Sequence, residues 1–508
     1  MKLDFAQHAK RNMLAGLLFS GIRLVFPFLN RTLFLWLLGP EFLGLNGLFT
    51  SILGVLSLAE LGFGRAVICS MYKPVADGDR ALLCAYLRFY RTLYRTVGLA
   101  VFGVGLCLAP FLRRLIHGDL PAGINLYILY FAHLFNTAAS YFFFAYRGSV
   151  LAAHARRDVI SNISSFVEVG KYVCVALVLF LTRNYYGYVA VTVVFTLLYN
   201  LLLLRESRRL FPDLFPEGRL DAERRRSVLS DAKSIFLHKV GGTVTGSTDN
   251  LVISSMLGLV AVAAYGNYYY VVTSVAGLVG ALSKSMLGGF GNKIYTESRE
   301  SNFRLFLKAN RVLMLATVWC AAVMAAVYQP FIEVWTRDNP TLMRHAATPL
   351  LMVVYFFVNQ SRQTLLTFKA AASLWKDDQW KPIVAGLLNL VVSVGLVLWL
   401  PEEWKLDGVI FGTIVSMLVI QVPWETHVLF TKYFTKAQKH RYWMEQINFA
   451  VLAVWLFFGA RLAAFTVEET GVMGFLFKGV AAAGAASAAL LMLLRRECLE
   501  LLHAVQRK

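Results

Sequence analysis

The chain has few charged residues for its length. Only 16% of its 508 residues are Asp, Glu, Lys or Arg, whereas 57% are hydrophobic. Soluble proteins carry about a quarter charged residues. This shortage excludes a set of ordinary soluble domains, and the 14% aromatic content fits a chain that lies mostly in lipid.

Cysteines and the common catalytic motifs are also scarce. The six Cys are scattered, with no Cys-x-x-Cys pair and no metal-like spacing to His, which argues against a disulfide framework or a zinc site. No GxxxxGK[ST], HExxH, GxSxG or GxGxxG motif occurs. The predicted outer loops are short, unlike those of polymerases and lipid-linked glycosyltransferases. We therefore predict a protein that is not an enzyme and has no cofactor or metal site, and for which Na⁺ or H⁺ coupling stays open.

Long apolar runs are abundant instead. A bilayer core about 30 Å thick needs about 20 apolar residues in a helix, which predicts about 14 transmembrane helices here. The first is predicted to be an uncleaved span, because Arg23 interrupts its apolar run and no small-residue cleavage site follows. The predicted class is an all-α polytopic membrane protein. Its spans are expected near residues 13–38, 42–72, 94–112, 124–146, 159–182, 185–204, 234–257, 260–291, 312–334, 346–368, 382–400, 407–430, 446–466 and 472–494.

The formal net charge of +20 is distributed unevenly. If the N-terminus lies inside, most Lys and Arg fall in inner segments, as the positive-inside rule requires. Nucleic acid is not needed to explain the charge. We therefore predict a multi-pass protein of the cytoplasmic membrane with both termini in the cytoplasm. The outer loops then hold only Arg113, Arg114, Arg183, Arg337, Arg344 and Lys405.

One long polar stretch, residues 205–233, follows six predicted spans and precedes eight. A weak repeat surrounds it, although turn chemistry alone would also place glycines at matched corners. Six spans separate the copies, so the halves share an orientation, as in parallel transporter repeats. We predict two six-helix lobes related by a pseudo-two-fold axis, at 1–204 and 234–432, a basic cytoplasmic linker at 205–233, and two extra helices with a tail at 433–508. The matched residues are Leu38-Gly39 with Leu257-Gly258, Leu43 with Val262, and Gly47 with Gly266.

Two stretches carry a family resemblance, LSLAELGFGRA at 56–66 and HKVGGTVTGSTDN at 238–250. With their surroundings, and with the segment from Thr364 to Leu398, they resemble polysaccharide flippases of the multidrug/oligosaccharidyl-lipid/polysaccharide exporter superfamily. The repeat-unit translocases of Gram-positive-type bacteria are the branch they resemble most. The resemblance covers most of the chain up to about residue 435.

The resemblance implies a fold similar to that of MATE transporters and a transport function. The implied cargo is undecaprenyl-diphosphate-linked oligosaccharide, moved across the membrane by alternating access for capsule or lipopolysaccharide synthesis. Its implied partners are membrane lipids and the glycosyltransferases and polymerase of the same pathway. A lipid II flippase and a multidrug or small-metabolite exporter remain alternatives, and a polysaccharide polymerase is a weaker one.

Ionisable residues inside the predicted spans are the candidate site, because a charge at mid-bilayer normally faces a cavity or a partner. Arg23 and Arg31 lie in the first predicted span, and Arg65 follows a Gly-broken stretch of the second. Guanidinium groups match phosphate oxygens bidentately, so these three predict a diphosphate clamp. The alternative is that each pairs internally or reaches an interface.

Further polar residues predict cavity lining, coupling or gating. Lys239 and Asn250 share one face of the seventh predicted span. Asp249, beside them, is expected to approach Arg31 and help close an outer gate. Three more residues are candidates for coupling. Glu60 either balances Arg65 or accepts a coupling proton, and Glu168 with Lys171 has the simpler explanation of an i, i+3 ion pair.

Overall fold

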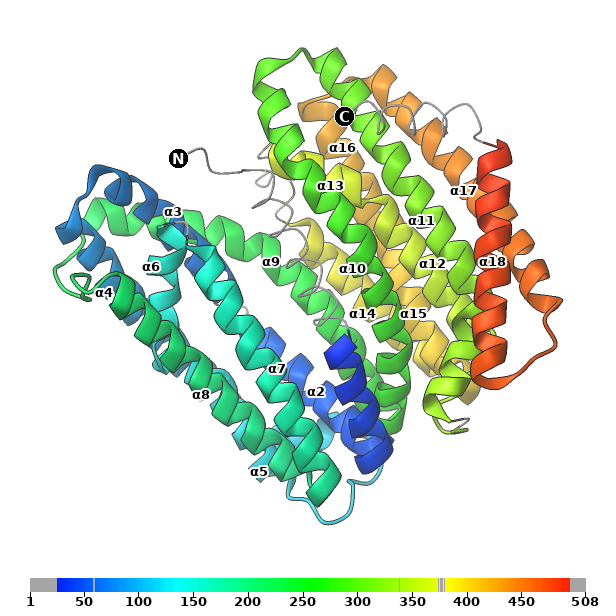
Figure 1. Ribbon diagram of the computed structural model, residues 1–508, viewed down its shortest axis with the longest axis horizontal. Helices are drawn as coiled ribbons and strands as arrows, with labels where there is room; N and C mark the ends of the chain where they lie inside the picture. The colour runs from blue at the N-terminus through cyan, green and yellow to red at the C-terminus, as the bar shows by residue number, and fades with distance from the viewer. Residues whose placement is uncertain are drawn as a thin grey trace, which may run out of the picture. The chain divides into compact units, whose positions relative to one another are not determined.

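The computed structural model describes residues 25–57, 60–154, 156–337, 339–372, 374, 378 and 380–493. At residues 60–62, 65, 231–245, 284, 285, 287–289, 291, 292, 295 and 493 it describes the backbone alone. The described residues form helices joined by turns and loops, and they contain no strand (Figure 1). This confirms the predicted all-α class.

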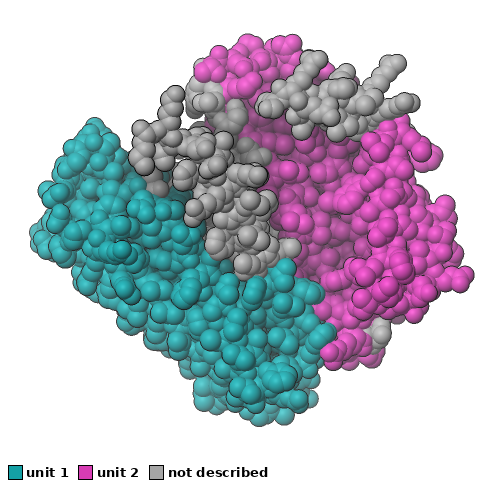
Figure 2. All heavy atoms as spheres, viewed as in Figure 1, with its two compact units in different colours: residues 1–263 teal, residues 264–508 magenta. Residues whose placement is uncertain are grey.

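The chain divides into two compact units, Met1–Ala263 and Ala264–Lys508 (Figure 2). Unit 1 contains the helices Val25–Leu38, α2 (Pro40–Leu56), α3 (Glu60–Asp77), α4 (Arg80–Leu108), η2 (Ala109–Leu115), α5 (Leu126–Phe142), η3 (Ala145–Arg147), α6 (Gly148–Ala153), α7 (Arg157–Thr182), α8 (Tyr185–Leu210) and α9 (Ala222–Met256). The helix α10 (Leu259–Thr296) begins in unit 1 and continues into unit 2. Unit 2 then contains α11 (Arg299–Thr336), α12 (Ala347–Ser361), α13 (Gln363–Ala371), α14 (Lys381–Trp399), η5 (Glu402–Trp404), α15 (Lys405–Ser416), the π-helical turn η6 (Met417–Gln421), α16 (Val422–Lys432), α17 (Lys436–Phe465) and α18 (Gly471–Leu493).

Many of these helices can cross a membrane. Within the described part of the chain, eight are long and apolar enough to do so alone, or nine if α5 and the bent segment after it form one span. Val25–Leu38 and α2 are apolar but shorter. The single span predicted at 42–72 is instead divided between α2 and α3, and the span predicted at 234–257 is the second part of the longer helix α9. Both α3 and α9 carry polar residues. The protein is therefore a multi-pass membrane protein.

The two matched glycine corners have the same local structure. Gly39 precedes α2 with φ of 98°, and Gly258 precedes α10 with φ of 88°, a region that favours glycine. In the first corner the Leu43 amide donates to the Gly39 carbonyl at 3.4 Å, and in the second the Val262 amide donates to the Gly258 carbonyl at 3.3 Å. The weak sequence repeat therefore corresponds to a repeated helix-to-helix turn.

Within unit 1, the helix α2 that follows the first corner packs closely against the first residues of α10. A side-chain carbon at Gly44 would overlap the carbonyl oxygen of Leu259, and one at Gly47 would lie 3.2 Å from a methyl carbon of Val262. Only a residue without a Cβ permits such a close approach of two backbones. Gly44 thus sets the distance between α2 and the start of α10.

The stretch predicted as a linker is mostly helical. The helix α8 extends to Leu210 and α9 begins at Ala222, so the loop covers only residues 211–221. The buried guanidinium of Arg147 donates to the Leu214 carbonyl at 2.7 Å, and Arg88 donates to the Gly218 carbonyl at 3.1 Å. These bonds hold the loop against η3 and α4 within unit 1. The predicted boundaries of the two six-helix lobes stay a prediction.

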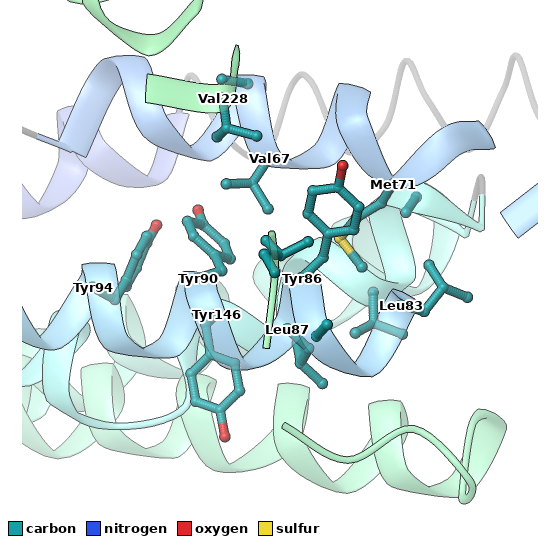
Figure 3. Close-up of a cluster of buried hydrophobic side chains, with 14 of the residues drawn as sticks. Val67, Met71, Leu83, Tyr86, Leu87, Tyr90, Tyr94, Tyr146 and Val228 are labelled. Atoms are coloured by element: carbon teal, nitrogen blue, oxygen red, sulfur yellow. The ribbon is translucent and has the colours of Figure 1, made fainter. Parts of the chain in front are cut away.

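A hydrophobic core lies next to this loop. Residues of α3, α4, η3 and α9 bury their side chains together, with Leu214 and Leu220 of the loop among them (Figure 3). Tyr90 and Tyr94 of α4 meet edge to face, with ring centroids 4.5 Å apart. Because Val228 of α9 belongs to the same core, the first turns of α9 pack against α3 and α4.

In unit 2 the last two helices pack on α11. Val318 and Ala322 of α11 lie in one buried cluster with residues of α17 and α18. Arg311 of α11 pairs with Glu445 of α17 at 2.7 Å. The small side chains of this cluster allow close helix packing, as is usual in membranes. The two C-terminal helices are thus an integral part of unit 2.

Candidate functional site

Arg31 lies in an aromatic part of unit 1. The helix Val25–Leu38 packs on α7 and α8, with Phe34 meeting the rings of Tyr185 and Tyr188 edge to face at centroid distances of 5.4 and 4.9 Å. Arg31 is half-buried, and its charge acts on Tyr188. The site predicted from the sequence therefore includes tyrosines that the sequence did not single out.

A buried polar chain continues from these tyrosines. The Tyr185 hydroxyl donates to Asn46 Oδ1 of α2 at 3.2 Å and lies 3.0 Å from His133 Nε2 of α5. Buried polar groups in lipid must find partners inside the protein. This chain joins α2, α5 and α8 through side chains that are far apart in the sequence.

Asp249 and Asn250 lie near the end of α9. Asp249 is 2% exposed, and Asn250 Nδ2 donates to Ser51 Oγ of α2 at 2.8 Å. Ser51 is five positions after Asn46, so the two point about 140° apart around α2. The structure thus places Asn250 against α2 on a different face from the Tyr185 chain, and the predicted pairing of Asp249 with Arg31 stays a prediction.

Glu168 and Lys171 are half-buried on α7. Ser164 Oγ donates to Glu168 Oε1 at 3.0 Å, and Lys171 Nζ lies 4.7 Å from the ring centroid of Tyr172. The charge of Glu168 also acts on Lys171. Both contacts are local to α7. A coupling role for either residue remains a prediction.

The other predicted site residues lack a described side chain. Arg23 lies outside the described residues. Glu60 and Arg65 lie on α3 and Lys239 lies on α9, each with its backbone alone described. The diphosphate clamp of Arg23, Arg31 and Arg65 therefore stays a prediction.

Unit 2 contains a buried ionic network that the sequence analysis missed. Arg362, between α12 and α13, binds Glu425 of α16 through two bonds, of 2.9 Å from Nε and 2.5 Å from Nη2. Lys381 Nζ lies 2.5 Å from the same carboxylate and 3.2 Å from Asp378 Oδ2. Lys369 completes the network by binding Asp378. All five side chains are at most 8% exposed.

The network borders a cavity of about 190 Å³ in unit 2. Arg362 and Glu425 form its charged end, and its remaining lining is mainly apolar side chains of α12, α16 and α17. The charged end lies where two helices deviate from regular geometry, since α12 breaks at Arg362 and the π-helical turn Met417–Gln421 precedes α16. Such irregular turns are frequent at functional sites.

One signal could have revealed this network. Glu425 is a carboxylate within the apolar run predicted at 407–430, and such a residue is a functional candidate by default. Its partners, Arg362 and Lys381, are 63 and 44 residues away in the chain. The sequence therefore marks Glu425 and, by the same rule, Arg362 in the run predicted at 346–368, but it does not show that they pair.

Comparisons with solved structures agree with this architecture. The chain is similar to a structure described as lipid II flippase MurJ in an inward closed conformation, with a TM-score of 0.64 and 14% identity over 94% of this chain and 100% of that chain. It is also similar to an inward-facing multidrug resistance MATE family transporter of the MOP superfamily, with a TM-score of 0.59 and 12% identity over 79% of this chain and 94% of that one. A MATE structure in complex with MaD3S gives a TM-score of 0.54 and 13% identity, over 81% of this chain and 93% of that chain. At these identities the likeness shows the fold, which is the predicted MATE-like one.

Comparisons at the level of sequence identify the family. No curated protein sequence matches this chain. The family model for polysaccharide biosynthesis proteins matches residues 9–286, which is more than half of the chain. The neighbours in family and fold are transporters, flippases and polysaccharide biosynthesis proteins rather than enzymes, in agreement with the prediction from the sequence. The chain belongs to the polysaccharide biosynthesis protein family.

Proposed function

We propose that this protein is a flippase that moves polyprenyl-diphosphate-linked oligosaccharide from the inner to the outer leaflet of the cytoplasmic membrane. The observation that carries the proposal is the family match together with the extent of the MurJ-like fold, which covers 94% of this chain. The MATE structures cover only about four fifths of it, although they are themselves covered almost completely. This chain thus shares more of its length with a lipid flippase than with these MATE transporters.

One guanidinium of unit 1 supports an anionic cargo. Arg31, in the helix Val25–Leu38, lies beside Tyr188, and the forked donors of a guanidinium fit a diphosphate better than a cationic drug. Cargo binding moves an equilibrium only if the two conformations bind it with different affinity. Net export therefore requires ion coupling or removal of the product outside.

Deletion of the gene tests the proposal. The proposed flippase predicts that lipid-linked repeat units accumulate on the inner leaflet and that surface polysaccharide is lost. A change in dye resistance alone would instead indicate a drug exporter. New glycosidic bonds formed by the purified protein in vesicles would indicate a polymerase.

Lipid II is the second candidate cargo, favoured by the likeness to MurJ. Expression of this chain in cells depleted of their lipid II flippase separates the two. Rescue of growth would assign lipid II. Failure to rescue, together with trapped repeat units in the deletion strain, would assign the oligosaccharide.

We propose in addition that Arg31 and Asp249 pair to close an outer gate. Charge reversal at either residue then abolishes transport, because two like charges meet in a low-dielectric region. The double variant Arg31→Asp/Asp249→Arg is expected to recover a measurable part of the transport rate of lipid-linked sugar. If each single variant is inactive and the double variant restores nothing, the pairing is wrong.

A further inference from the structure

Hydrogen bonds to its backbone hold the short loop between α11 and α12 in place within unit 2. The Arg344 amide donates to the Tyr268 hydroxyl at 3.2 Å, and Gln329 Nε2 donates to the Arg344 carbonyl at 3.5 Å. Tyr268 in turn donates to Gln329 Oε1 at 3.2 Å. These bonds determine the position of the next residue, His345.

His345 lies against the beginning of α15. Its Nε2 atom is 2.9 Å from Asp407 Oδ2 and 3.1 Å from the Glu403 carbonyl oxygen. Its ring lies on Trp404, with a centroid distance of 4.1 Å and an interplanar angle of 40°. The side chain of His345 is 29% exposed, whereas that of Asp407 is 5% exposed. Part of the imidazole therefore reaches the surface, and the carboxylate lies behind it.

The charges around this pair are of two kinds. Arg344 acts on Asp407 with a permanent positive charge, and the exposed Glu402 binds the half-buried Lys405 nearby. Tyr268 stays neutral over the physiological range. Histidine is the side chain that changes its charge between about pH 5 and 8. Among these contacts of the loop and of α15, a change of the outer pH can therefore alter the contact between His345 and Asp407.

We propose that His345 and Asp407 form a proton-binding site at the outer end of unit 2, through which the outer pH acts on transport. The proposal rests on the flippase function above and on the orientation that the positive-inside rule predicts. Protonation turns the contact into an ion pair that fastens the loop to the first turn of α15. A neutral imidazole can offer Asp407 only a hydrogen bond, so the contact is weaker when the outer solution is less acidic. Nε2 of His345 faces two oxygen acceptors, so the added proton goes to Nδ1, which is buried and has no hydrogen-bond partner among the described residues.

Trp404 provides a direct readout, because a protonated imidazole quenches an adjacent indole. We expect the fluorescence of the full-length protein in nanodiscs to fall as the pH is lowered from about 8 to about 5. This change should be absent in His345→Gln and in Trp404→Phe. Asp407→Asn should lower the midpoint, because the carboxylate no longer favours the charged imidazole. His117→Gln, at an exposed histidine of another predicted outer loop, is the matched control and should titrate as wild type.

Transport provides the second measurement. Vesicles with fixed inner pH and varied outer pH are supplied with a fluorescent polyprenyl-diphosphate-linked sugar. The wild-type rate should change several-fold across the fluorescence midpoint, and the His345→Gln rate should not depend on outer pH. A fluorescence titration that survives in His345→Gln overturns the proton site. An intact titration with a pH-independent wild-type rate overturns its role in transport. No movement of this sugar at any pH, with an intact titration, overturns the flippase function instead.

Discussion

Glu425 carries the negative charge that two buried cations share. It binds Arg362 and Lys381, and its side chain is 0% exposed. Glu425→Gln keeps the size of the side chain but leaves both cations without this counter-charge. Removal of one partner of a buried ion pair costs about 3–5 kcal/mol, so we expect a clearly lower melting temperature in detergent.

The matched control for this substitution is Glu468→Gln, at an exposed glutamate of the turn between α17 and α18. Exposed charges contribute little to stability, so this variant should melt as wild type. Equal melting of Glu425→Gln and Glu468→Gln would show that the network does not stabilise unit 2.

The residues of the network show what the sequence could and could not predict. An ionisable residue in an apolar run is visible in the sequence, which is why Arg31, Glu168 and Lys171 were identified. Lys369 and Lys381 flank the ends of the apolar runs predicted at 346–368 and 382–400, where the positive-inside rule predicts ordinary cytoplasmic lysines. Their burial depends on Asp378 and Glu425, and contacts between separate helices are not encoded in local periodicity.

At the scale of elements, Gly44 determines how closely α2 approaches the start of α10. A methyl group there would overlap the Leu259 carbonyl, which is backbone and cannot rotate away. Overpacking of this kind costs about 1–3 kcal/mol. We therefore expect Gly44→Ala to unfold at a lower temperature than wild type.

Gly103→Ala is the matched control on α4. A Cβ at Gly103 meets no atom within 4 Å, so alanine should be neutral or up to about 1 kcal/mol stabilising through its helix propensity. Thermal unfolding of both variants by the same method compares the two. If Gly44→Ala is as stable as Gly103→Ala, the close approach is not a constraint.

Helices were easier to predict than the segments between them. The apolar runs predicted α7, α8, α11 and α14 because helix length and hydrophobicity suffice for a span. The stretch 205–233 looked like a linker because it is polar. Its loop is instead fixed by Arg147 and Arg88, which donate to backbone carbonyls, and a carbonyl acceptor leaves no sequence signature.

At the scale of the whole molecule, the distribution of charge predicts the orientation in the membrane. The helix α17 is 30 residues long, about 45 Å, so its ends lie on opposite sides of a bilayer. Its first turns carry Lys436, Lys439 and Arg441, whereas Glu468 and Glu469 follow its other end. The positive-inside rule assigns the basic end to the cytoplasm. The exposed loop 211–221, next to the basic ends of α8 and α9, is assigned to the same side.

Two single cysteines test this orientation in a variant whose native cysteines are replaced. Glu217→Cys, in the loop 211–221, should react with a membrane-impermeant maleimide only after the cells are permeabilised. Glu468→Cys should react in intact cells, because its turn is predicted to face outward. Both positions are exposed, so a difference in labelling reports the side of the membrane rather than burial. Labelling of Glu217→Cys in intact cells would reverse the orientation and would place His345 and Asp407 on the cytoplasmic side, where the outer pH cannot reach them.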